Sequence, residues 1–180
     1  MMNDPLEELG QELRTQVAGE FRRAAEEEEF DARLAALRAR DLAQVMFELM
    51  SRGDTVAVHV AGHVHTGIVS HARGTLATVD TKAGSRIHVN LQGAFSITVV
   101  ERATTGGKSF DKYGAESFVA RLRQCELEAN VVELHVSGRD HVLSGTVDIV
   151  AKDHLMVVAT SGETTVVPLQ HVLALVEQLP

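Results

Sequence analysis

The amino-acid sequence predicts an α+β fold, in which an N-terminal helical arm precedes two tandem units that each consist of a short helix and a small β-barrel. Two observations predict this arrangement. Apolar residues first recur every three or four positions and then alternate with polar ones, and the same change of period occurs again further along the 180-residue chain. We place the arm, the first unit, a linker and the second unit at residues 1–38, 39–103, 104–114 and 115–180.

The arm is expected to be a helix over residues 5–29. Asp4 followed by Pro5 is typical of a helix start, because the carboxylate can cap free N–H groups and proline fits the first turn. Four glutamates at 26–29 interrupt the apolar pattern, which favours a break there or a strongly solvated stretch of one longer helix. The candidate partner-binding surface is an apolar stripe, which packs across both barrels or on another chain and consists of Leu6, Leu9, Leu13, Val17 and Phe21.

A second helix is expected over about 31–51, with Gly53 as its left-handed C-terminal cap. The first strand follows, because Val56, Val58 and Val60 then recur at every second position. Further short strands are expected near residues 75–80, 86–90 and 94–100.

Residues 104–114 break the strand pattern with glycine and polar side chains, which indicates a linker. The run Gly106-Gly107-Lys108-Ser109 is similar to the end of a phosphate-binding loop, but the full motif requires glycine where Arg102 stands. A third helix follows, with Ser117 as its N-cap and Cys125 on its core face. We therefore expect the single cysteine of the chain to be a buried structural thiol.

The two units form an internal repeat. A shift of 76 residues aligns their first strands and matches His59 with His135, and after the first turn the shift becomes 78 and matches Gly67 with Gly145. The second unit therefore has two extra residues in its first hairpin. An even number keeps every later side chain on its original face of the sheet, whereas a single inserted residue would reverse them all.

A short helix followed by five strongly bent strands resembles the Sm-like and broader SH3-like small barrels. The residues that carry this resemblance are 56–60, Gly62, Gly67, Gly84, 89–91 and 95–97 in the first unit, and 132–136, Gly138, Gly145, Gly162, 167–169 and 173–175 in the second. Sm proteins usually bind RNA through an Asp–Asn pair after the second strand and an Arg-Gly pair before the last strands. Neither pair is present here, so the resemblance implies a fold and no RNA-binding residues.

Composition and charge exclude several classes of protein. Hydrophobic residues make up 44% and charged residues 23%, as in globular domains. No apolar run is long enough to span a membrane, and no signal peptide is evident, so we expect a cytoplasmic protein without membrane contact. No cofactor motif is present.

Five of the nine histidines lie in the first predicted barrel. If residues 61–63 form a three-residue hairpin loop, His59 lies opposite His65 on the face away from the core, and His63 lies at the tip. Three converging imidazoles could bind Zn²⁺ or another borderline metal ion. The alternatives are three exposed histidines on a wet strand face, or a pH sensor.

Three basic residues of the same unit could contact a phosphate, namely Arg73, Lys82 and Arg86. They are the candidate RNA-binding residues. The net charge of −8 and the scarcity of aromatic residues do not support nucleic-acid binding, and ordinary loop charge is the alternative.

No nucleophile with a base, carboxylate pair or complete metal set can be assembled, so we expect no enzymatic activity. The sequence favours a binding or scaffold protein that acts through protein–protein contacts or self-association, by way of its sheet edges and helical arm. An RNA-associated Sm-like regulator and a metal- or pH-responsive module are the alternatives. Because the first unit is neutral and rich in histidine whereas the second is acidic, any site is expected in only one of them.

Overall fold

The computed structural model describes residues 5–104, 106–107 and 114–178, with side chains from residue 14 onward except residue 15. The chain divides into two compact units, one up to Arg40 and one from Asp41 onward. Each unit is described by itself.

The first unit is a single helix, α1, which spans Pro5–Arg38. The helix continues through residues 26–29, whose glutamates are all exposed, so the second of the two alternatives for this run is confirmed. The apolar side chains of Val17 and Phe21 are also exposed, at 47% and 73%. The side chains of the other three stripe residues, Leu6, Leu9 and Leu13, lie outside the described residues. Within the described chain, no helix has both the length and the apolar character required to cross a membrane.

The second unit begins with the helix α2, which spans Leu42–Arg52. The prediction of one helix over 31–51 is wrong, because the Asp41 carboxylate accepts a hydrogen bond from the Gln44 backbone N–H at 2.7 Å and starts a new helix. The Gln44 side chain accepts a bond from the Asp41 N–H in return, which completes a capping box. Gly53 ends α2 in the left-handed conformation, as predicted.

We expect Asp41→Ala to destabilise the second unit by about 1 kcal/mol, because two N–H groups at the start of α2 lose their partners. Urea unfolding of the full chain measures this loss. Asp31→Ala, in the interior of α1, is the matched control, and an equal effect of both substitutions would contradict the capping role.

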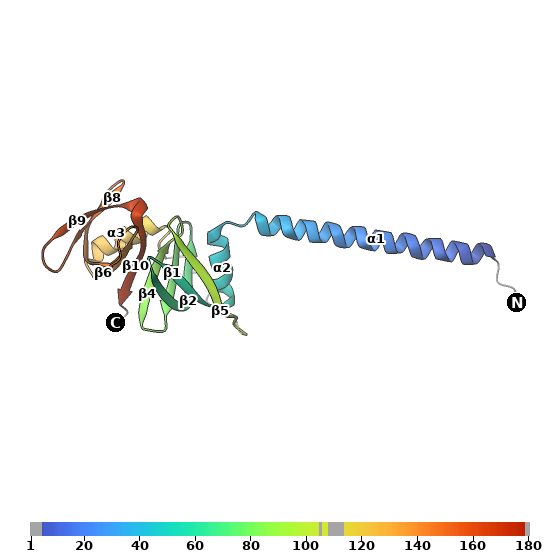
Figure 1. Ribbon diagram of the computed structural model, residues 1–180, viewed down its shortest axis with the longest axis horizontal. Coiled ribbons are helices and arrows are strands. Elements are labelled where there is room, and N and C mark those ends of the chain that lie inside the picture. Colours follow the sequence, from blue (N-terminus) through green and yellow to red (C-terminus); the bar gives the residue numbers. More distant parts are fainter. Residues whose placement is uncertain (1–4, 105, 108–113, 179–180) are drawn as a thin grey trace. The chain divides into compact units, whose positions relative to one another are not determined.

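The strands of this unit form one antiparallel sheet of ten strands, in the order β5-β1-β2-β3-β4-β10-β6-β7-β8-β9 (Figure 1). The third helix, α3, spans Phe118–Glu128 and is capped by Ser117, as predicted. The strands of the first half are β1 Thr55–Val60, β2 His63–Arg73, β3 Leu76–Thr81, β4 Ser85–Asn90 and β5 Phe95–Glu101. Those of the second half are β6 Val131–Val136, β7 Leu143–Val150, β8 His154–Val158, β9 Thr164–Pro168 and β10 Val172–Gln178, with the short 3₁₀ helix η1 Leu169–His171 before β10.

The sheet is open, and two separate closed barrels are not confirmed. The two halves instead join through β4 and β10, where Val89 pairs with Ala174 and Ile87 pairs with Val176. β5 and β9 form the two edges, and each has one neighbour among the described strands.

The pairing pattern of β1–β5 occurs again in β6–β10. His59 pairs with Ser96 between β1 and β5, and the residues that correspond to them in the second half, His135 and Ala174, pair between β6 and β10. An irregularity between Val69 and His71 in β2 has its counterpart in β7, between residues 147 and 149. The two halves therefore share strand order, these registers and the irregularity in their second strands, whereas the irregularities of the β1–β5 and β6–β10 ladders lie at different positions.

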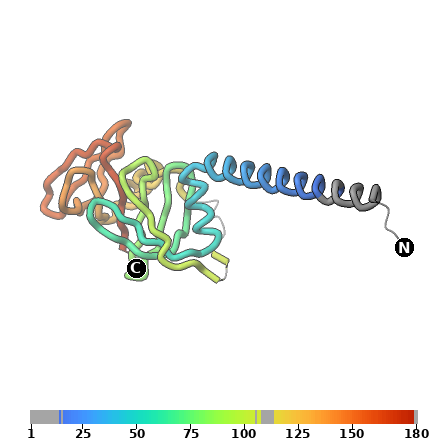
Figure 2. Tube along the Cα trace, turned by 45° about the vertical axis from the view of Figure 1, so that its right-hand side comes forward, coloured from blue at the N-terminus to red at the C-terminus, as the bar shows by residue number. Residues whose placement is uncertain are grey.

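Two hydrophobic cores lie on opposite faces of β10. Ala174 and Val176 belong to the first core, together with α2 and β1–β4, whereas Leu175 belongs to the second, together with α3 and β6–β9. Figure 2 shows β10 between the two halves of the sheet. Because both of its faces are covered, its residues 172–176 are all buried. Cys125 is buried in the second core, as predicted.

Candidate functional site

The β1–β2 hairpin turns through two residues. Ala61 and Gly62 both have positive φ, at 47° and 78°, as a two-residue hairpin turn requires. Val60 therefore pairs with His63, and Val58 pairs with His65. The predicted three-residue loop is wrong, and the register differs from the prediction by one residue.

This difference separates the three histidines that the sequence analysis grouped. Because directly paired residues point to the same face, His63 and His65 share the face of Val58 and Val60, which line the first core. His59 pairs with Val64, and both are exposed on the opposite face. A metal site made of His59, His63 and His65 is therefore excluded by the register.

The third histidine beside His63 and His65 comes from the second half of the sheet. His135 is buried on β6, and its Nε2 atom lies 3.2 Å from Nε2 of His65. The ring centroid of His135 lies 5.1 Å from that of His65 and 4.7 Å from that of His63. The three imidazoles thus gather where the β1–β2 hairpin meets β6.

Two of the three imidazoles have lowered pKa values. Burial, reinforced by the two neighbouring imidazoles, lowers the pKa of His135 to about 4. Burial and the proximity of His63 also lower the pKa of His65, although the nearby Glu133 carboxylate opposes this shift. The Nδ1 atom of His135 is buried and has no hydrogen-bond partner in the described part of the chain.

A second polar cluster lies where β4, β10 and α3 meet. Glu177 accepts hydrogen bonds from Nε2 of His88 at 2.6 Å and from the Arg121 guanidinium at 2.5 Å. Arg121 also contacts Glu128 at 3.1 Å, and Thr78 Oγ1 lies 3.0 Å from Nδ1 of His88. These partners are satisfied when His88 is neutral and carries its proton on Nε2, with the Thr78 hydroxyl donating to Nδ1.

The charges of this second cluster compensate one another. Burial alone would raise the pKa of Glu177, but the hydrogen bonds that it accepts from His88 and Arg121, together with the charge of Arg121, outweigh burial and lower the pKa to about 2. Burial raises the pKa of the Cys125 thiol to about 12. Cys125, Glu128 and Glu177 place their ligand atoms within 4.8 Å of one another, but the Arg121 guanidinium already bridges the two carboxylates. We therefore interpret the cluster as a structural ion network.

A cavity of about 460 Å³ lies beside this network. Its lining includes Asp80, Arg86, His88, Arg121, Gln124 and Glu128. Charges of both signs line it, and they are paired, since Arg86 contacts Asp80 at 2.7 Å and Arg121 contacts Glu128. The charged groups of the lining pair with one another, although Nε of Arg121 is buried without a hydrogen-bond partner among the described residues.

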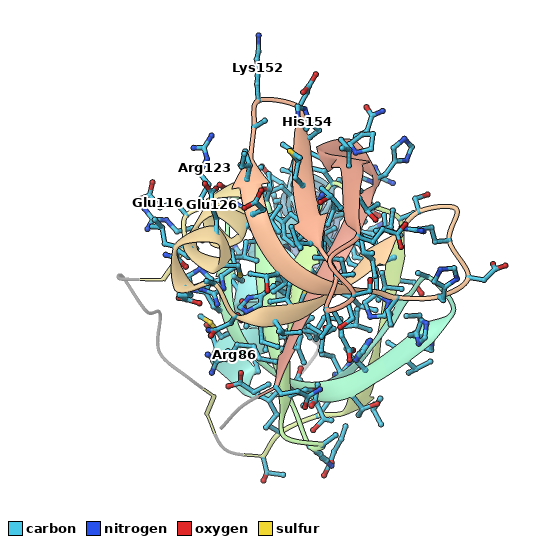
Figure 3. All side chains as sticks on the ribbon, turned by 90° about the vertical axis from the view of Figure 1, so that its left-hand side faces the viewer. Arg86, Glu116, Arg123, Glu126, Lys152 and His154 are labelled. Atoms are coloured by element: carbon cyan, nitrogen blue, oxygen red, sulfur yellow. The ribbon has the colours of Figure 1, made fainter. Side chains whose placement is uncertain are left out.

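The three candidate RNA-binding residues do not form a shared basic surface. Arg73 contacts Glu116 at 2.9 Å, and Arg86 contacts Asp80. Lys82 is exposed in the turn between β3 and β4. Figure 3 shows Arg86 on the sheet and Glu116 beside α3. Because two of the three cations have carboxylate partners, little positive charge is left for a phosphate.

The two sheet edges are the remaining candidate site. β5 has one charged residue, Glu101 at its end, and β9 has none. Val99, Val100 and Val166 on these edges are 42%, 58% and 58% exposed. Edge strands commonly carry lysine, proline or bulges that prevent pairing with another chain. Such protection lies here near the ends of the two strands, in an irregularity of β5 at Val100 beside Glu101 and in Pro168 of β9.

Sequence reasoning missed His135 as a member of the histidine cluster, although the repeat aligned it with His59. It also missed Glu177 and Arg121. A single signal pointed to Glu177, which is the acidic residue that directly follows the apolar run 172–176.

Neither the protein-family models nor the curated proteins compared with the chain gave a match. No activity is therefore transferred from a relative.

Proposed function

We propose that this chain is a non-catalytic scaffold protein that assembles with further copies of itself through the edges of its sheet. The observation that carries the proposal is the junction between β4 and β10. One half of the chain already recognises the other there by strand pairing, and the strands at the two free edges correspond to the two strands of this junction.

The shared strand order and registers support two tandem helix-plus-strand repeats of the Sm-like type, one in each half of the sheet; each repeat is called a unit here. Within each unit the strands run in the order fifth, first, second, third, fourth. The junction pairs β4, the fourth strand of the first unit, with β10, the fifth strand of the second. The free edges are β5, the fifth strand of the first unit, and β9, the fourth strand of the second.

The same junction can therefore form between two copies. Inside the chain, Val176 of β10 pairs with Ile87 of β4. The repeat shift of 78 residues converts this pair to Thr98 of β5 and Thr165 of β9. Pro168 does not obstruct the contact, because its counterpart Asn90 lies just beyond the paired segment of β4.

We expect this contact to be weaker than the internal junction. Ser96 and Thr98 of β5 stand where β10 has Ala174 and Val176, so less apolar surface is buried on pairing. The contact joins two different surfaces, so repetition closes a ring or extends a filament. The exposed Val17 and Phe21 of α1 offer a second contact surface on the same chain.

Disulfide cross-linking tests the register. In the double variant Thr98→Cys with Thr165→Cys, mild oxidation should link separate chains into dimers and larger species on a non-reducing gel. Directly paired antiparallel residues have Cα atoms about 4.5–5.5 Å apart, which suits a disulfide. Buried Cys125, whose pKa is raised to about 12, should not compete.

The matched control is Thr98→Cys with Glu163→Cys. In the expected register these residues are diagonal neighbours about 7–8 Å apart, so they should link poorly. Sedimentation velocity of the unmodified protein should show mass that rises with concentration. A monomer at all concentrations, together with equal cross-linking of both cysteine pairs, would exclude the proposal.

A further inference from the structure

We infer that His65 and His135, with His63 as a third ligand, bind a divalent transition-metal ion such as Zn²⁺ between the β1–β2 hairpin and β6. This inference does not depend on the proposed self-assembly. It replaces His59 of the sequence prediction by His135 and makes the site a link between the two halves of the sheet.

The spacing of two nitrogen atoms carries the inference. In a tetrahedral zinc site with Zn–N bonds of about 2.0–2.1 Å, two ligand nitrogens lie about 3.3 Å apart. The Nε2 atoms of His65 and His135 are 3.2 Å apart. Without a metal ion, one of these nitrogens must donate a proton to the other, and a bound ion would take the place of that proton.

His63 is placed to complete a three-histidine set. It lies two residues before His65 on the same face of β2, its side chain is exposed, and its ring centroid lies 4.7 Å from that of His135. The nitrogens of the three rings do not yet all converge, so His63 must rotate about its side-chain bonds. Water would occupy the fourth position, as in zinc sites with three protein ligands.

One nearby group favours a cation, because the Glu133 carboxylate opposes the lowering of the pKa of His65. Burial lowers the pKa values of His65 and His135, which keeps both ligands neutral at pH 7, as ligation requires, but burial itself does not favour a positive charge. By contrast, in the set formed by Cys125, Glu128 and Glu177 both carboxylates are bound by the Arg121 guanidinium, whose positive charge repels a metal ion.

The alternative is that the histidines only close one end of the first core. The second half shows what such a closure looks like, because the repeat places Leu143, a buried apolar residue, where the first half has His65. Nδ1 of His135 is buried without a partner among the described residues whether or not Nε2 binds a metal ion, so it does not distinguish the two roles. The distinguishing observation is that three imidazoles gather where the second half has a leucine.

Zinc titration of the full chain, without a histidine tag and after removal of metal by EDTA, tests the inference. Calorimetry at pH 7.5 should show one Zn²⁺ per chain. His65→Ala should weaken binding by at least about a hundredfold and His63→Ala by at least about tenfold, since a lost ligand should cost at least as much as a lost partner of a ligand. His59→Ala, on the opposite face of the same hairpin, should bind as the unmodified protein does.

Thermal unfolding gives an independent readout, since Zn²⁺ that binds the folded chain should raise the Tm of the unmodified protein and of His59→Ala equally, and that of the His63 and His65 variants less. Because His135 is buried, the circular dichroism spectrum of His135→Asn is first compared with that of the unmodified protein. If His135→Asn does not fold, His65→Ala is the decisive variant, because His65 is half-exposed. Absence of zinc binding at 100 μM, or equal binding by the His65 and His59 variants, would overturn the inference.

Discussion

Glu177→Gln is expected to lower the free energy of unfolding by about 3 kcal/mol, because it removes the one carboxylate that holds both Arg121 and His88. Glutamine keeps the volume of the side chain but not its charge. The Arg121 side chain, which is 14% exposed, then keeps Glu128 as its anionic partner among the described residues. The effect is large because the network joins three elements, β4, β10 and α3, at the junction between the two halves.

Urea unfolding at pH 7 measures this loss. Glu128→Gln is the matched control, since Glu128 contacts the same guanidinium but its side chain is 43% exposed. An exposed ion pair contributes little, so we expect a loss of less than about 1 kcal/mol for this variant. Equal losses for the two variants would contradict the central role of Glu177.

The difference in the free energy of unfolding between the unmodified protein and Glu177→Gln should depend on pH. The pKa of Glu177 in the folded chain is lowered from 4.5 to about 2, so its stabilisation is fully present above pH 4.5 and is lost as the pH falls toward 2. The difference in stability between the unmodified protein and Glu177→Gln should therefore shrink over this range. A difference that persists at pH 2 would show that the substitution acts through packing.

Gly67→Ala is expected to destabilise the protein by about 3 kcal/mol, because β3 passes too close to β2 at this point for any side chain. A Cβ atom at residue 67 would overlap the Asp80 carbonyl oxygen and would lie 2.8 Å from Cα of Thr81. Both neighbours are backbone atoms of a paired strand, so they cannot move aside without breaking the β2–β3 ladder.

Thermal unfolding checks this prediction, with Gly106→Ala as the matched control. A Cβ at residue 106 would meet no atom within 4 Å, so we expect a change of less than about 0.5 kcal/mol. Gly145 occupies the corresponding place in the second half, where its Cβ would overlap the Val158 carbonyl oxygen. Gly145→Ala should therefore behave like Gly67→Ala, and stability equal to the Gly106 variant would contradict the close approach.

The local elements could be predicted from the sequence because their signals are local. The left-handed cap at Gly53, the N-cap at Ser117 and a strand over 55–60 are confirmed. The expected alternation of β1 is not, because every residue of this strand except His59 is buried. The start of α2 was missed even though Asp41 and Gln44 form a capping box, because the helical apolar pattern continues across it. The turn at Ala61 was missed because alanine rarely adopts positive φ.

The single sheet could not be predicted from local patterns, because the partner of β10 is set by contacts far apart in the chain. One sign was present, since a continuous apolar run such as 172–176 is typical of a strand covered on both faces, whereas β5 carries polar Ser96 and Thr98. The histidine cluster depends on the same long-range contact. His65 and His135 meet only because the β1–β2 hairpin lies against β6.

The position of β10 also sets the order in which the chain from Asp41 onward can fold. The first core contains α2 and β1–β4, yet it includes Leu173, Ala174 and Val176, which are synthesised long after β4. The N-terminal half emerging from the ribosome therefore has an exposed apolar face at β4 until β10 arrives. Closing so long a loop costs entropy and slows folding. Both cores must then complete together, so the two halves should unfold as one cooperative body despite their repeated design.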